Sequence, residues 1–97
     1  MPTYPLINAA GARVRLTRPQ WDCLCELVAL LEKRPLLDTW LVSDLYPARD
    51  NQHNAKRRLV TALVDKGVLE RRPAGLHLPA RVRAQVRSSP HGQPEPR

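Results

Sequence analysis

The sequence predicts a mainly α fold with small β-hairpins, in which a three-helix core is followed by a C-terminal hairpin. The middle of the chain repeats apolar residues at helical spacing, whereas segments on both sides alternate polar and apolar residues. Hydrophobic residues make up 42% of the chain but aromatic residues only 4%, and Phe is absent, so we expect an aliphatic core of packed helices. A length of 97 residues suits a single folding unit.

Residues 1–16 are expected to form a β-hairpin that turns at Ala10 and Gly11. The segment from Arg13 to Leu16 alternates polar and apolar side chains, which is typical of a strand with one buried face. We expect two short strands at the periphery of a domain formed by residues 17–79.

The first helix is predicted to begin after Thr17, because Gln20 follows at the spacing of a capping box. Pro35 ends it. Asp38 is predicted to cap a second, short helix that Pro47 stops. The apolar stripes of these helices are Trp21, Leu24, Cys25, Val28 and Leu31, and then Leu41, Val42 and Leu45; Trp40 lies in the second helix but off its stripe, where an interface role stays open.

A third helix is predicted at about residues 50–66, capped by Asp50 or Asn51 and ended by Gly67, which readily adopts the left-handed conformation after a helix. Its buried face is expected to consist of Ala55, Leu59, Ala62 and Leu63, extended by Val60.

The chain then changes to a period of two, which predicts a tight hairpin over residues 68–78 with its tip at residues 73–75. Residues 80–87 can form a short basic helix that touches the body through Val82 and Val86. Residues 88–97 hold three prolines and no apolar anchor, so we expect a disordered tail.

The formal charge of +7 is concentrated in the second half of the chain. Residues 1–49 hold six basic and five acidic side chains, a net of +1, whereas residues 50–97 hold ten and four, a net of +6. Such an excess favours a polyanionic partner, because lysines and arginines near phosphates release condensed counterions. Charge alone leaves DNA, RNA and an acidic protein open.

The exposed face of the third helix carries the side chains that reading of DNA bases requires. Asn and Gln pair with adenine and Arg with guanine in the major groove, and no carboxylate lies between Asn51 and Ala62. The predicted DNA-binding residues are Asn51, Gln52, His53, Asn54, Lys56, Arg57, Arg58 and Thr61 on the helix, with Arg71 and Arg72 on the following hairpin.

The order of these elements resembles a winged helix-turn-helix domain. The segment from Leu59 to Arg71, LVTALVDKGVLER, is similar to the recognition helix and wing of MarR-like regulators, and Leu16, Thr17, Gln20 and Trp21 resemble the start of the first helix in MarR-like and OmpR-type domains. The resemblance implies a sequence-specific, double-stranded DNA-binding transcriptional regulator, with a repressor favoured. The third helix would read the major groove and the wing would meet phosphates or the minor groove. A homodimer would form if the terminal segments supply an interface.

The alternative function is a winged-helix interaction module, a small inhibitor or adaptor that docks on an acidic protein. RNA binding is a third option, less favoured because no aromatic stacking surface is visible. We expect no enzyme, cofactor or metal, since His53, His77 and His91 are scattered and no catalytic motif is present. Cys23 and Cys25 are expected to be buried, reduced thiols. No signal peptide or membrane span is visible, which favours the cytoplasm.

Overall fold

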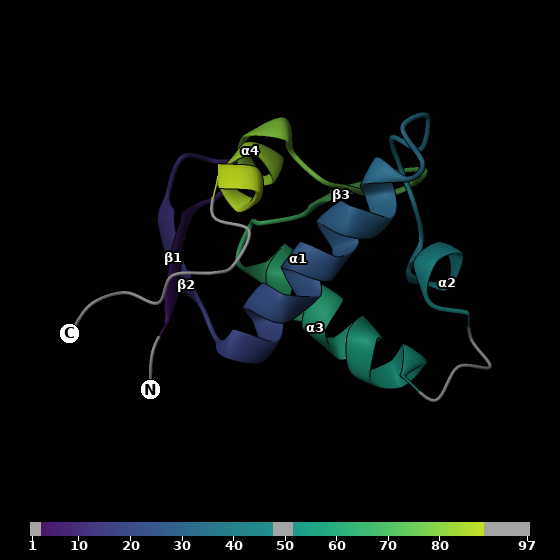
Figure 1. Ribbon diagram of the computed structural model, residues 1–97, viewed down its shortest axis with the longest axis horizontal. Helices are drawn as coiled ribbons and strands as arrows, with labels where there is room; N and C mark the ends of the chain where they lie inside the picture. The colour runs from purple at the N-terminus through teal and green to yellow at the C-terminus, as the bar shows by residue number, and fades with distance from the viewer. Residues whose placement is uncertain (1–2, 48–51, 89–97) are drawn as a thin grey trace.

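The computed structural model describes residues 3–47 and 52–88, which form a mainly α structure with two small antiparallel hairpins (Figure 1). This confirms the predicted class at that level. Helix α1 crosses the centre, with α3 against it and α4 beside the N-terminal hairpin. The elements in chain order are β1 (Tyr4–Ile7), β2 (Arg13–Leu16), α1 (Arg18–Glu32), α2 (Val42–Leu45), α3 (His53–Asp65), β3 (Glu70–Arg72), β4 (Gly75–His77) and α4 (Ala80–Ser88).

The N-terminal hairpin consists of two short strands at one edge of the molecule, as predicted (Figure 1), and its inner face is part of the hydrophobic core. Strands β1 and β2 pair in the register Tyr4↔Leu16, and both of these side chains are buried, as is Leu6. The Tyr4 ring stacks on Trp21 of α1 with the ring centroids 5.4 Å apart. The alternation of side chains in β2 predicted a buried face, but it could not predict how much of α1 that face would cover.

The turn of this hairpin is held by Asn8, which is buried. Its Oδ1 accepts hydrogen bonds from the backbone N–H of Ala10 and Ala12, and its Nδ2 donates to the carbonyl of Lys66 at the end of α3. One side chain thus closes the β1–β2 turn and ties it to the end of α3.

Helix α4 packs on α1 and β1 through Val82 and Val86, the two residues predicted to touch the body. The amide of Gln85 joins α4 to the backbone of Ile7: Ile7 N–H donates to Oε1 at 2.8 Å, and Nε2 donates to the Ile7 carbonyl at 2.8 Å. The helix ends at Ser88, so this residue is not part of the predicted tail, and residues 89–97 lie outside the described part of the chain.

Helix α1 begins as predicted. The Thr17 hydroxyl accepts a hydrogen bond from Gln20 N–H, and the Gln20 side chain accepts one from Thr17 N–H, which completes the capping box. The inner face of the helix is apolar and fully packed, and Leu24, Leu27 and Leu31 lose essentially all contact with solvent.

The segment before α2 differs from the prediction. The helix begins at Val42, and the carboxylate of Asp44 accepts from Leu41 N–H, so Asp38 is not the cap. Trp40 is not helical: its N–H donates to the Leu76 carbonyl at 2.9 Å and its carbonyl accepts from Leu76 N–H at 2.6 Å. Trp40 is only 1% exposed, which excludes the interface role left open for it.

Helix α3 begins at His53 with Gln52 at the N-cap position, and Asp50 and Asn51, the predicted caps, lie outside the described residues. Gly67 has a φ of 76° and ends the helix as predicted. The predicted buried face was partly wrong, because Ala55 is exposed while Val60 and Leu63 form the buried centre. The helix is therefore rotated slightly from the predicted orientation.

Candidate nucleic-acid interface

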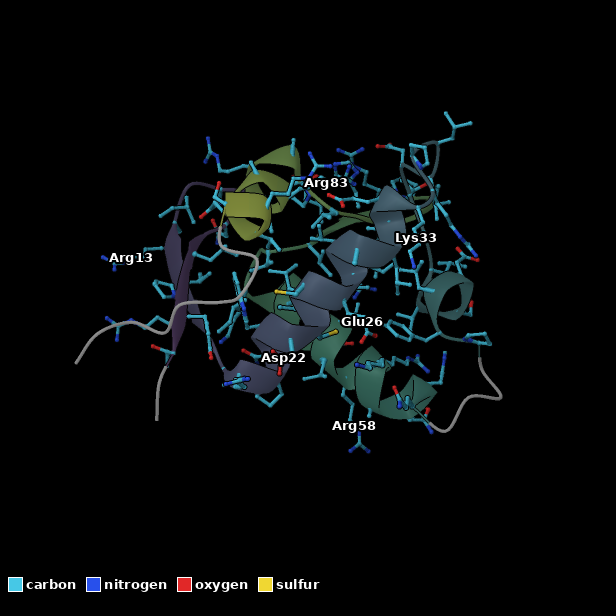
Figure 2. The ribbon with its side chains drawn as sticks, viewed as in Figure 1. Arg13, Asp22, Glu26, Lys33, Arg58 and Arg83 are labelled. Atoms are coloured by element: carbon cyan, nitrogen blue, oxygen red, sulfur yellow. The ribbon has the colours of Figure 1, made fainter. Side chains whose placement is uncertain are left out.

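The outer face of α3 brings together four of the predicted DNA-binding residues. A shallow hollow of about 540 Å³ on this face is lined by Asn54, Arg57, Arg58 and Thr61, all of which are exposed. Arg58 projects away from the body of the protein (Figure 2). The first carboxylate along α3 is Asp65, near its C-terminal end, so this face carries positive charge and amide or hydroxyl groups only.

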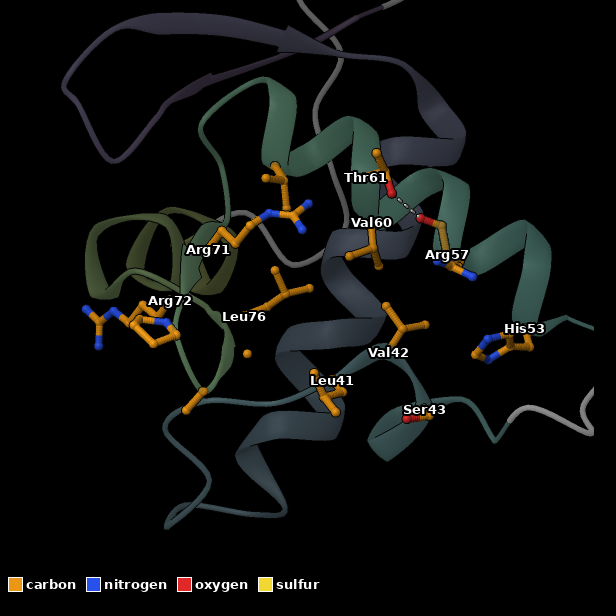
Figure 3. A pocket seen from close by; sticks show the side chains of 14 residues that line it. Leu41, Val42, Ser43, His53, Arg57, Val60, Thr61, Arg71, Arg72 and Leu76 are labelled. Carbon is orange, nitrogen blue, oxygen red and sulfur yellow. Dashed lines mark hydrogen bonds between the residues drawn. The ribbon is translucent and has the colours of Figure 1, made fainter.

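A groove of about 760 Å³ separates α3 from α2 and from the β3–β4 hairpin (Figure 3). Its floor is apolar, with Val60 and Leu76 as buried members, and Arg57 and Arg71 border it from α3 and the hairpin. None of the side chains that line it is a carboxylate. They are Leu41, Val42, Ser43, His53, Arg57, Val60, Thr61, Val64, Arg71, Arg72, Pro73, Ala74 and Leu76, together with the backbone of Gly75.

The two hairpin arginines have different surroundings. The guanidinium of Arg72 lies 3.4 Å from Asp38 and 3.2 Å from Glu70, so its charge is compensated within the protein. Arg71 has no ion pair within the described residues, and its side chain extends toward α3 across the groove (Figure 3). Of the two, Arg71 is the one whose charge is available to a ligand.

Lys56 does not share the outer face of α3. Its side chain is only 18% exposed, its Nζ lies 3.4 Å from Oε1 of Glu26 on α1, and it sits 5.5 Å from the centroid of the Tyr46 ring. Tyr46 in turn donates a hydrogen bond to Glu26. Lys56 therefore helps to join α3 to α1 and to the segment after α2.

The residues at the start of α3 are placed unevenly. His53 is half-buried, with Nδ1 at 2.7 Å from the Tyr46 carbonyl, and it lines the groove. Gln52 is exposed at the N-cap, and Asn51 lies outside the described residues. Sequence reasoning missed Glu26 and Tyr46 as the groups that position α3, because Glu26 lies on another helix, 20 residues from Tyr46 and 30 from Lys56, and no local pattern links the three.

Burial controls the ionisable groups beneath α3. Burial, and then the hydrogen bond to Glu26, raise the pKa of Tyr46, so its hydroxyl stays protonated and donates to that carboxylate. Burial also raises the pKa of Cys23 to about 11, against the lowering effect of Lys56. A thiol in this state is a poor nucleophile, which agrees with the expected inert, reduced cysteine.

Over residues 3–47 and 52–88, no cluster of three or more His, Cys, Asp or Glu side chains has the arrangement of a metal site. In the same part of the chain, no helix has the length and apolar character required to cross a membrane. Comparison of the chain with family models, with curated proteins and with solved structures finds no match.

Proposed function

We propose that this chain binds double-stranded DNA and acts as a sequence-specific transcriptional regulator. The observation that carries the proposal is a continuous surface without carboxylates, which runs from Asn54 and Arg58 on α3 across the groove to Arg71. Arg57, Arg58 and Arg71 have no ion pair within the described residues, so their charges are free to meet an anion. Arginines that have no ion pair within the described residues and lie on or beside an exposed helix suit a duplex backbone.

In this proposal α3 enters the major groove, which is wide enough for one α-helix. Arg57 or Arg58 would contact guanine O6 and N7, and Asn54 would contact adenine N6 and N7. Arg71 would reach a phosphate or a narrow minor groove beside the site. Phosphate contacts set the position of the protein, while the α3 side chains discriminate between base pairs.

The arrangement around α3 supports a winged helix-turn-helix interpretation. Helix α2 lies beside α3 and α1 packs behind it. The backbone bridge between Trp40 and Leu76 adds an extended segment to the β3–β4 hairpin, which steadies the hairpin next to α3. A fixed hairpin loses less conformational freedom on binding than a loose one, so this contact favours affinity.

The test is a selection of bound duplexes from random sequence, followed by fluorescence anisotropy with the selected duplex. The double variant Arg57→Ala, Arg58→Ala should lose at least about fivefold in affinity, because one two-pronged guanine contact contributes about 1–3 kcal/mol. Its thermal stability should not change, since both side chains are exposed. The matched control is Arg81→Ala, an exposed arginine on α4.

Two results would contradict the proposal: a double variant that binds as tightly as the parent, or a selection that enriches no motif. An enriched palindrome with half-sites about one helical turn apart would indicate a homodimer.

An acidic protein partner is the second candidate, favoured by the apolar floor of the groove and by Leu41, which is 53% exposed at its edge. Such a floor suits an amphipathic segment with acidic side chains. Salt titration separates the two functions. Binding to duplex that falls steeply and linearly on a log–log plot against salt supports DNA, whereas no binding to any duplex supports the protein partner.

A further inference from the structure

The imidazole of His53 joins the start of α3 to the end of α2 and lines the groove between these two helices (Figure 3). Its Nδ1 lies 2.7 Å from the Tyr46 carbonyl oxygen. A carbonyl oxygen can only accept a hydrogen bond, so the proton of the neutral ring is on Nδ1. The other ring nitrogen, Nε2, has no hydrogen-bond partner within the described residues. The ring therefore has one tautomer and one unused nitrogen.

The two charge states of this ring offer opposite groups to a ligand. In the neutral ring Nε2 carries a lone pair, which accepts hydrogen bonds and repels a phosphate oxygen. In the protonated ring the same atom carries an N–H and shares a positive charge, and a hydrogen bond from such a group to phosphate is one of the stronger kinds. The bond from Nδ1 to the Tyr46 carbonyl is kept in both states. A phosphate contact at Nε2 therefore requires a protonated ring.

The charged side chains that share the groove with His53 are all positive among the described residues. Arg57 lies one turn further along α3, and Arg71 and Arg72 line the groove from the β3–β4 hairpin. Because no carboxylate lines this groove, a protonated His53 finds no counter-charge inside it. An anion that enters the groove supplies that counter-charge.

The carboxylates on the helices beside the start of α3 are already engaged. Glu26 of α1 accepts a hydrogen bond from the Tyr46 hydroxyl and lies 3.4 Å from the ammonium of Lys56. Asp44 of α2 accepts a hydrogen bond from Leu41 N–H at 2.8 Å. Neither carboxylate lines the groove, so neither provides an acceptor for a proton on Nε2 there.

We propose that protonated His53 donates a hydrogen bond from Nε2 to a phosphate of the DNA backbone, so that duplex binding takes up a proton. This inference rests on the proposed function and adds its regulation by pH. Because the phosphate stabilises the protonated ring, linkage requires that affinity for duplex rises as pH falls through the range from about 8 to 5, in which imidazoles titrate. The contact sets the position of α3 and reads no base.

The first experiment measures affinity for the selected duplex by fluorescence anisotropy at pH 8.5 and pH 5.5 and at one salt concentration. The parent should bind at least about fivefold more tightly at pH 5.5, or about 1 kcal/mol. His53→Asn keeps a side-chain N–H in reach of the Tyr46 carbonyl but has no atom in place of Nε2, so its affinity should change less than about twofold. The matched control is His77→Asn, on β4 and outside the groove, which should keep the parental pH dependence.

The second experiment uses salt to distinguish a phosphate from a base as the partner of His53. Each phosphate contact adds about 0.9 to the slope of log affinity against log salt concentration on a B-form duplex. The slope of the parent should therefore be steeper at pH 5.5 than at pH 8.5 by up to about 0.9. The slope of His53→Asn should be the same at both pH values.

The outcomes separate this inference from the proposed function. Duplex binding with the same pH dependence in the parent and in His53→Asn overturns the inference and leaves DNA binding intact. Equal salt slopes of the parent at the two pH values also overturn it, and this result holds even if His53→Asn fails to fold. A parent that binds no duplex at either pH overturns both the inference and the proposed function.

Discussion

Lys56 and Arg57 are neighbours on α3, yet their charges meet different surroundings. Lys56 lies against Glu26 and the ring of Tyr46, whereas Arg57 borders the groove and has no ion pair within the described residues. A sequence pattern assigns both to a polar surface. Only the distant partners of Lys56 show that its aliphatic stem packs and its ammonium is compensated within the fold.

This difference predicts separate effects for the two side chains. Lys56→Met should change DNA affinity less than about twofold but should alter the melting temperature, because the charge of Lys56 acts within the protein. Arg57→Ala should lower DNA affinity and leave the melting temperature unchanged. Thermal unfolding and fluorescence anisotropy on the same selected duplex measure the two quantities. A large loss of affinity in a stable Lys56→Met protein would place this lysine at the interface instead.

The two cysteines should differ in reactivity. Cys23 is buried, and burial raises its pKa to about 11; Cys25 is half-buried, and burial raises its pKa as well. Because the thiolate is the reactive form, iodoacetamide at pH 8 should modify Cys25 first and Cys23 only after denaturation. Mass spectrometry of the labelled chain measures the rate at which each cysteine is modified. Equal rates in the native protein would contradict the burial of Cys23.

The raised pKa of Cys23 makes the free energy of unfolding depend on pH. Because this pKa lies above the ordinary value in the folded protein, the stability that the protonated thiol contributes is fully present below the ordinary pKa. That stability is lost as pH rises from there toward about 11, because unfolding then releases the proton.

At the scale of the element, sequence patterns predicted α1 best and α2 least well. The capping residues and the wide apolar stripe of α1 are local signals, and they were sufficient to predict where this helix begins and which face it buries. For α3, apolar residues at Leu59, Val60, Leu63 and Val64 leave the rotation of the helix uncertain by about one residue, and contact with α1 decides it. Trp40 pairs with a residue 36 positions away, which no local pattern reveals.

The β3–β4 hairpin depends on Gly75. It has a φ of 143°, and a Cβ there would lie 2.7 Å from the Trp40 carbonyl oxygen. Gly75→Ala should therefore destabilise the protein by about 1–3 kcal/mol, the range for strained backbone. Ala74→Gly, at the exposed tip of the same hairpin, is the control and should cost less. Chemical denaturation measures both, and equal costs would mean that the contact with Trp40 does not constrain this position.

For the whole molecule, the N-terminal hairpin is part of the hydrophobic core. Tyr4, Leu6 and Leu16 are all buried within one cluster that also holds residues of α1, α3 and α4. The division of residues 1–16 from residues 17–79 came from the change in sequence pattern at Thr17. Local patterning marks the boundary of an element, but it carries no information on which surfaces meet.

Removal of residues 1–16 should abolish cooperative folding. Each of the three buried side chains contributes about 1.5–3 kcal/mol. Their sum is comparable to the whole stability of a small domain, about 5–15 kcal/mol. Thermal unfolding by circular dichroism tests this, with Ile7→Ala on the exposed side of β1 as a control of small effect. A truncated chain with a sharp transition would show that the hairpin is dispensable.

The pairing of Gln85 with Ile7 has a consequence for how copies of this chain behave together. An uncovered strand edge recruits strands from other molecules and leads to aggregation. The Gln85 amide occupies both backbone groups of Ile7, and Pro5 on the same strand has no N–H to offer. Gln85 therefore prevents other copies of the chain from pairing with the edge of β1. Gln85→Leu would make the protein prone to form fibrous aggregates at high concentration.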